Sequence, residues 1–148
     1  MNNTLVLGLG NTLLKDDGIG VRVIEKLEGE NLKAEIRNGA TLGFSLFETL
    51  KNSEKVIVID AVDMGEPPGA IARFSAKELL SLPASKKFSL HEIGLLEILK
   101  IGRSLNEDFS NVVVIGIQPR DLSHGEELSP EVEKVIHKII EMIKKEVN

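Results

Sequence analysis

The sequence predicts an α/β fold, in the form of a single-domain three-layer sandwich. A mostly parallel central sheet of about five strands is expected, with helices on both faces. Val56–Asp60 and Asn111–Gly116 are continuous runs of β-branched apolar residues, which is typical of parallel strands buried on both faces. Segments with apolar residues at helical spacing alternate with the predicted strands along the chain, as in a sheet built from strand–helix–strand units.

The first half of the chain begins with a short apolar strand, Leu5–Gly8. A loop rich in glycine and asparagine joins it to the helix predicted over Ile19–Leu27, for which Asp17 is a natural N-cap. Right-handed crossovers make the first and third strands neighbours and leave the second outside. The other elements predicted here are a strand over Ala34–Arg37, a helix over Gly43–Leu50 with Phe44, Phe47 and Leu50 inward, and the strand Val56–Asp60.

The second half ends in the clearest helical pattern of the sequence. Ser129 and Pro130 mark its start, and isoleucines and valines follow at steps of three and four. Before it, the chain predicts an edge strand over Ala70–Ser75, a helical turn over Ala76–Leu82, a loop over Pro83–Phe88, a helix over Ser89–Gly102, the strand Asn111–Gly116 and a polar loop over Gln118–Glu127.

Composition limits the class of protein. The 148 residues suit one domain, residues 1–148, and 42% of them are hydrophobic, which is enough for a core. No signal peptide and no apolar stretch of membrane-spanning length is found, so a cytoplasmic protein is expected. The absence of cysteine excludes disulfides and thiolate chemistry, so any metal must be held by oxygen or imidazole. The net charge of −5 argues against a nucleic-acid partner.

Candidate functional carboxylates follow the first and third strands. Their carboxyl ends should meet at one crevice, which brings Asp17 and Asp60 together. A carboxylate at a helix N-terminus stays ionised, which suits a metal ligand or a base. Asp16, one residue earlier, is expected to be a helix cap or a solvated side chain in a supporting role.

His91 is the third candidate. Ser89 and Glu92 fit a capping box, which would place His91 in the first turn of a helix, where the dipole favours the neutral imidazole needed for metal ligation. His124 and His137 are weaker candidates and are expected at a rim and on a solvated surface. Two carboxylates and one imidazole would suit a borderline divalent ion with open coordination positions.

Several familiar motifs are absent or incomplete. No HExxH and no GxxxxGK[ST] sequence occurs, and Gly43–Phe47 lacks the second glycine of a nucleophile elbow. Gly8-Leu9-Gly10-Asn11-Thr12-Leu13 matches only half of the dinucleotide fingerprint, and Asp16 and Asp17 would place negative charge near the pyrophosphate.

Four motifs in order resemble those of the hydrogenase maturation endopeptidases, which trim the C-terminal extension from the large subunit of nickel–iron hydrogenases. The resemblance covers nearly the whole chain. Its motifs are Gly8–Asn11 with Asp16–Gly20, Val58–Gly65 with Pro68-Gly69, His91 with Gly94-Leu95, and Gly116–Pro119.

The resemblance implies that Asp17, Asp60 and His91 form the metal-binding and catalytic set. It also implies that they engage nickel already loaded in the hydrogenase precursor, which is the expected partner. Another divalent ion could take the place of nickel in the isolated protein. The family usually has Asp-Gly-Gly-Thr after the second strand, whereas this chain has Asn38-Gly39-Ala40-Thr41. Asn38 cannot act as a base, so this position would orient the loop or a substrate amide.

Two alternatives stand beside this hypothesis. Peptidyl-tRNA hydrolases also open with a strand and Gly-Leu-Gly-Asn, but they need a histidine soon after it, and none occurs here before His91. A non-catalytic metal-binding domain would use the same trio without cleaving anything. The segments Pro83–Leu90 and Gln118–Glu127 are expected to form the rim of the site, and the protein is expected to be a monomer.

Overall fold

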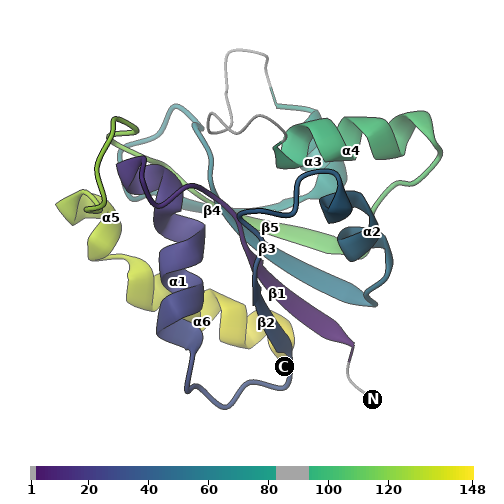
Figure 1. Ribbon diagram of the computed structural model, residues 1–148, viewed down its shortest axis with the longest axis horizontal. Helices are drawn as coiled ribbons and strands as arrows, with labels where there is room; N and C mark the ends of the chain where they lie inside the picture. Colours follow the sequence, from purple (N-terminus) through teal and green to yellow (C-terminus); the bar gives the residue numbers. More distant parts are fainter. Residues whose placement is uncertain (1–2, 83–93) are drawn as a thin grey trace.

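The computed structural model describes residues 3–82 and 94–148, and it has the predicted α/β architecture (Figure 1). One sheet of five strands has the order β2-β1-β3-β5-β4. All neighbouring strands are parallel except β4, which lies antiparallel to β5. The elements are β1 Thr4–Gly8, the 3₁₀ turn η1 Lys15–Gly18, α1 Ile19–Leu27, β2 Glu35–Asn38, α2 Ser45–Lys51, β3 Lys55–Ala61, β4 Ile71–Ser75, α3 Ala76–Leu80, α4 Leu95–Ser104, β5 Val112–Ile117, α5 Pro130–Glu133 and α6 Ile136–Val147.

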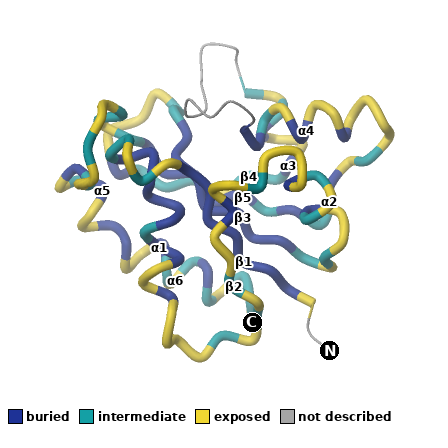
Figure 2. Tube along the Cα trace, in the orientation of Figure 1, coloured by how far each residue is buried: buried dark blue, intermediate teal, exposed yellow. Residues whose placement is uncertain are grey.

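Alternate residues of the strands face two separate apolar layers. Leu7 and Val58 belong to the layer that α2, α3 and α4 cover, whereas Val6 and Ile57 belong to the layer beneath α1 and α6. Figure 2 shows the central strands as buried and the outer surfaces of the helices as exposed. The predicted three-layer arrangement and the position of β1 between β2 and β3 are therefore confirmed.

Three local predictions are wrong. Asp17 does not cap α1, because Gly18 occupies the N-cap position and no side chain caps this helix. Phe44 does not point inward. It is the N-cap residue directly before α2, which begins at Ser45, and 67% of its surface is exposed. The C-terminal helix is not continuous, because Val135 leaves helical geometry (φ −99°, ψ 1°) between α5 and α6.

In the described part of the predicted helix Ser89–Gly102, α4 begins at Leu95. Gly94 has an extended backbone (ψ 175°) and is the N-cap of α4. Its N–H donates to Oε1 of Glu97 at 3.1 Å. The capping box predicted at Ser89 and Glu92, together with the predicted loop Pro83–Phe88, lies outside the described residues. No helix among residues 3–82 and 94–148 is long and apolar enough to cross a membrane.

Candidate active site

Asp60 lies at the carboxyl edge of the sheet, near the end of β3. Its side chain is fully buried, and it pairs in register with Gly116 of β5. On the other side of β3, the backbone N–H of Leu9 donates to the carbonyl oxygen of Ile59 at 3.0 Å, which extends the β1–β3 pairing to the residue before Asp60. Oδ1 of Asp60 accepts a hydrogen bond of 2.9 Å from the N–H of Ala61. The backbone of this part of β3 is thus held by the strands on both sides, and the carboxylate accepts a hydrogen bond from the residue that follows it.

Asp17 reaches the same edge through η1, which packs against β3. The side chain is 1% exposed, and its Oδ2 accepts a hydrogen bond of 2.8 Å from the backbone N–H of Asn11. Gly10 makes this approach possible, because its φ is +123° and an added Cβ would lie 1.9 Å from the carbonyl oxygen of Asp17. The Gly-Leu-Gly-Asn segment is therefore a tight turn that holds Asp17.

The start of α1 closes the arrangement. A Cβ added to Gly20 would lie 2.2 Å from the carbonyl oxygen of Ile59 and 2.3 Å from that of Leu9, so the helix rests directly on the ends of β1 and β3. Asp17 lies shortly before Gly20 in the sequence, and Asp60 directly follows Ile59. The structure therefore places both predicted carboxylates around one junction of β1, η1 and β3, as the strand order leads one to expect.

Asp16 is neither solvated nor a cap of α1, which corrects that part of the prediction. It is fully buried, and its two oxygens accept four hydrogen bonds of 2.7–3.0 Å from the loop between β5 and α5. We call residues 118–129 the β5–α5 loop. Asp16 thus has a supporting role, but its partners lie more than 100 positions away in sequence.

The third predicted ligand, His91, lies outside the described residues. Within the described part of the chain, no group of three histidine, cysteine, aspartate or glutamate side chains could hold a metal ion. His124 and His137 are exposed, in agreement with the secondary roles that the sequence predicts for them. The described residues alone therefore offer two carboxylates, and a metal site here requires a further donor.

Gln118 organises the loop that follows Asp60, a role that neither its motif nor its place in the predicted rim segment indicates. It is 7% exposed, and its Oε1 accepts hydrogen bonds from the N–H groups of Met64 (2.6 Å) and Glu66 (3.3 Å). Its Nε2 donates to Oδ1 of Asp63 at 3.1 Å and to the carbonyl oxygen of Pro119 at 3.3 Å. A glutamine directly after a buried strand, where an exposed turn residue is usual, was the available signal.

Asn38 orients its own loop. The side chain is exposed, and its Oδ1 accepts a hydrogen bond of 2.9 Å from the N–H of Ala40. Two roles were predicted for Asn38, orienting the loop or orienting a substrate amide, and this hydrogen bond corresponds to the first. A small cavity of about 40 Å³ lies beside this turn, lined by Leu9, Gly10, Gly39, Ala40, Gly43, Leu46, Gly94 and Leu95.

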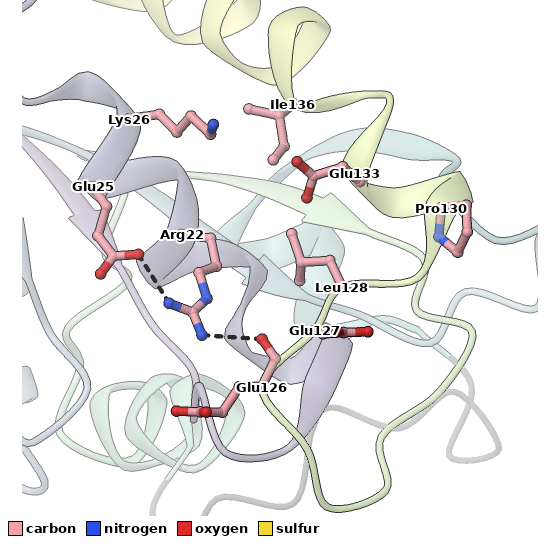
Figure 3. Close-up of a pocket in the computed structure, with 9 residues that line it drawn as sticks. All are labelled: Arg22, Glu25, Lys26, Glu126, Glu127, Leu128, Pro130, Glu133 and Ile136. Carbon is pink, nitrogen blue, oxygen red and sulfur yellow. Dashed lines mark hydrogen bonds and ion pairs between the residues drawn. The ribbon is translucent and has the colours of Figure 1, made fainter.

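A wider groove of about 750 Å³ lies between α1 and the segment that leads into α6 (Figure 3). In it, the guanidinium of Arg22 donates to Oε1 of Glu25 at 3.2 Å and to the carbonyl oxygen of Glu126 at 3.0 Å. Neither Asp17 nor Asp60 lines this groove. Volume alone therefore does not identify the site, and the buried carboxylates at the sheet edge are the better candidates.

The chain is similar to known proteins in both sequence and fold. Residues 21–146 match the family model described as "Hydrogenase maturation protease". The chain is 34% identical to the hydrogenase 2 maturation protease of Escherichia coli, over 94% of this chain and 87% of that protein. It also superposes on the structure of the maturating endopeptidase HybD from E. coli with a TM-score of 0.80 and 34% identity, covering 97% of this chain and 90% of the other.

Some relatives are longer than this chain. The hydrogenase expression/formation protein HupD of Thiocapsa roseopersicina is 35% identical over 93% of this chain, but the match spans only 64% of its own length. The family match nonetheless extends over most of the chain described above, from within α1 to the last turn of α6. This chain belongs to the hydrogenase maturation protease family.

Proposed function

We propose that the protein is an endopeptidase that removes the C-terminal extension of a nickel-loaded large-subunit precursor of a nickel–iron hydrogenase. Membership of the family supports the activity. The observation that carries the proposal is the junction of β1, η1 and β3, where Asp17 and Asp60 are both almost completely buried. The family membership also favours this function over the peptidyl-tRNA hydrolase alternative.

In this proposal, Asp17, Asp60 and His91 recognise the nickel of the precursor, which is part of the substrate. The two carboxylates supply negative charge in a site shielded from water, where attraction to a cation is stronger than at an exposed surface. A divalent ion held there would polarise the scissile carbonyl or lower the pKa of a water molecule. Asp17 is the carboxylate that we assign to accept the proton from the attacking water and to return it to the amine nitrogen as the scissile C–N bond breaks.

The precursor would reach these groups over the carboxyl edge of the sheet. The β5–α5 loop lies at this edge, because it follows the end of β5, and hydrogen bonds join it to η1. Residues 83–90 were also expected at the rim, but they fall outside the described residues. A loop fixed against the turn that carries Asp17 is suited to hold the precursor in register with the reacting groups.

A cleavage assay tests the proposal. Asp17→Asn and Asp60→Asn keep the shape of each side chain but remove its charge, and each is expected to lower single-turnover cleavage of the nickel-loaded precursor by about 100-fold or more. His91→Gln should have a comparable effect if the histidine completes the set. Wild-type cleavage by the two aspartate variants would overturn the mechanism.

Two controls separate the proposal from its rivals. His137→Gln changes an exposed histidine of α6 and should leave cleavage unchanged. Precursor without nickel should remain intact, whereas its cleavage would rule out recognition of the metal while leaving the peptidase activity standing. Tight nickel binding by the isolated protein in calorimetry, with no cleavage of loaded precursor, would instead identify a non-catalytic metal carrier.

A further inference from the structure

We propose that Asp16 is the positioning residue that holds Asp17 in place, by clamping η1 to the β5–α5 loop. The inference rests on the proposed function, because it gives Asp16 a task in the same site. It concerns a different contact, however, and it can be tested without metal or precursor. Asp16 itself touches neither the precursor nor the reacting atoms in this proposal.

The carboxylate of Asp16 has four donors, all from the β5–α5 loop. Oδ1 accepts from the N–H of Ser129 at 2.7 Å, and Oδ2 accepts from the hydroxyl of the same serine at 2.7 Å. Oδ2 also accepts from the N–H groups of Arg120 at 2.9 Å and Asp121 at 3.0 Å. A carboxylate with no exposed surface and four donors is held rigidly, because charge-assisted hydrogen bonds are about twice as strong as neutral ones.

The backbone adds a second set of contacts across the same boundary. The N–H of Asp16 donates to the carbonyl oxygen of Asp121 at 3.1 Å, and the N–H of Lys15 donates to that of Gly125 at 2.9 Å. The N–H of Gly125 in turn donates to the carbonyl oxygen of Leu13 at 2.9 Å. The turn that carries Asp17 is thus attached to the loop at Asp16 itself and at Leu13 and Lys15, which precede it.

The next carboxylate along the chain, that of Asp17, is held by a different segment. Oδ2 of Asp17 accepts from the N–H of Asn11, in the turn after β1. Two adjacent carboxylates therefore face different segments, and rotation of η1 would move both. Fixing Asp16 to the β5–α5 loop limits that rotation and so sets the position of Asp17.

Asp16→Asn is the direct test, because the two side chains have the same shape. The NH₂ group of the new asparagine would face hydrogen-bond donors in either orientation of the side chain. In place of Oδ2 it would face three donors, and in place of Oδ1 it would face the N–H of Ser129. We expect a folded protein in which kcat for precursor cleavage falls about tenfold or more, because small displacements of a reacting group are costly. The expected change in KM is smaller.

A second measurement, by NMR, does not depend on cleavage of the precursor. The amide proton of Asn11 reports the position of the Asp17 carboxylate that accepts it. In a proton–nitrogen correlation spectrum of the isolated protein, Asp16→Asn should shift this resonance, whereas core amides such as that of Val58 should stay in place. A folded Asp16→Asn variant with an unshifted Asn11 resonance and wild-type kcat would overturn the inference.

Ser129→Ala covers the case in which Asp16→Asn fails to fold. It removes only the hydroxyl donor and leaves the N–H, so it should shift the Asn11 resonance in the same direction and lower kcat by a smaller factor. Unchanged values for both would count against the clamp. Ser104→Ala is the matched control, because it also removes a serine hydroxyl, but one that donates to the carbonyl oxygen of Lys100 within α4, outside η1 and the β5–α5 loop.

The outcome is distinguishable from failure of the proposed function. If Asp17→Asn cleaves the precursor at the wild-type rate, the proposed role of Asp17 is wrong, whatever Asp16 does. If Asp17→Asn is inactive while folded Asp16→Asn is fully active and unshifted at Asn11, only the clamp is wrong.

Discussion

At the scale of single residues, the site depends on buried polar side chains that accept hydrogen bonds from backbone groups. Asp16, Asp17 and Gln118 all have less than a tenth of their surface exposed. Each accepts hydrogen bonds from the backbone of a loop at the carboxyl edge of the sheet. Burial of such groups is costly unless their hydrogen bonds are made, so the loops around the site should be sensitive to loss of one partner.

Gln118→Leu tests this sensitivity beside Asp60. The variant leaves the N–H groups of Met64 and Glu66 without their acceptor. We expect the free energy of unfolding to fall by about 1 kcal/mol, the contribution of an ordinary hydrogen bond, because these bonds are only partly buried. The segment Met64–Glu66 would also lose its side-chain contacts with the start of the β5–α5 loop, so kcat/KM for the precursor should fall several-fold.

Urea unfolding and the cleavage assay together measure both effects. Met64→Leu is the matched control, since it changes the side chain at one of the two positions and keeps its N–H. If Gln118→Leu were as stable and as active as this control, Gln118 would have no organising role in the loop.

At the scale of secondary-structure elements, the last turn of α6 is attached to two strands through Glu146. Its carboxylate pairs with Arg73 of β4, and its Oε2 lies 3.1 Å from Nζ of Lys55 on β3. The hydrogen bond from Arg73 and the two positive charges lower the pKa of Glu146 below its ordinary value of 4.5. The helix that covers one face of the sheet is thereby linked to it electrostatically as well as by apolar packing.

Glu146→Gln should reveal this link as a pH-dependent loss of stability. The pKa of Glu146 is lower in the folded than in the unfolded protein, so the ionised side chain stabilises the fold above the unfolded value. That contribution is lost as the pH falls through the folded pKa. We expect a loss of about 0.5–1 kcal/mol at neutral pH, because both cationic partners are partly exposed.

Thermal unfolding of wild type and variant between neutral and acidic pH measures the difference, which should vanish in acid. Glu141→Gln is the control on the same helix, because its side chain is 67% exposed and lies 3.9 Å from its partner Lys144. A difference from wild type that stays constant down to low pH would contradict the assigned origin.

The elements also show which features the sequence could predict. Continuous runs of β-branched residues predicted β3 and β5, and apolar residues at helical spacing predicted helix near the C-terminal end. Both patterns are local, because the spacing of apolar residues determines which faces of an element are buried. The true start of α1 and the burial of Asp16 depend on contacts with the β5–α5 loop, more than 100 residues away, which no local pattern contains. The hydrogen bonds of Gln118 to the segment after Asp60, more than 50 positions away, are likewise absent from any local pattern.

At the scale of the whole molecule, stability should be unequal across the sheet. The β3 residues Val56–Asp60 are fully buried between two apolar layers, and β3 lies between β1 and β5. The strand β2 pairs only with β1, and most of its residues are exposed. The carboxyl edge, where Asp17 and Asp60 lie, therefore stands on the most deeply buried part of the fold.

Native-state hydrogen exchange tests this distribution. Amides of β3, such as those of Ile57 and Val58, should exchange only through global unfolding, with a free energy equal to that obtained from urea unfolding. Amides of β2 should exchange through local opening at a lower free energy, because this strand is at the edge and half exposed. If Ile36 were as protected as Ile57, β2 and β3 would open as one unit, and the junction at Asp17 would be supported by the whole sheet rather than by its centre.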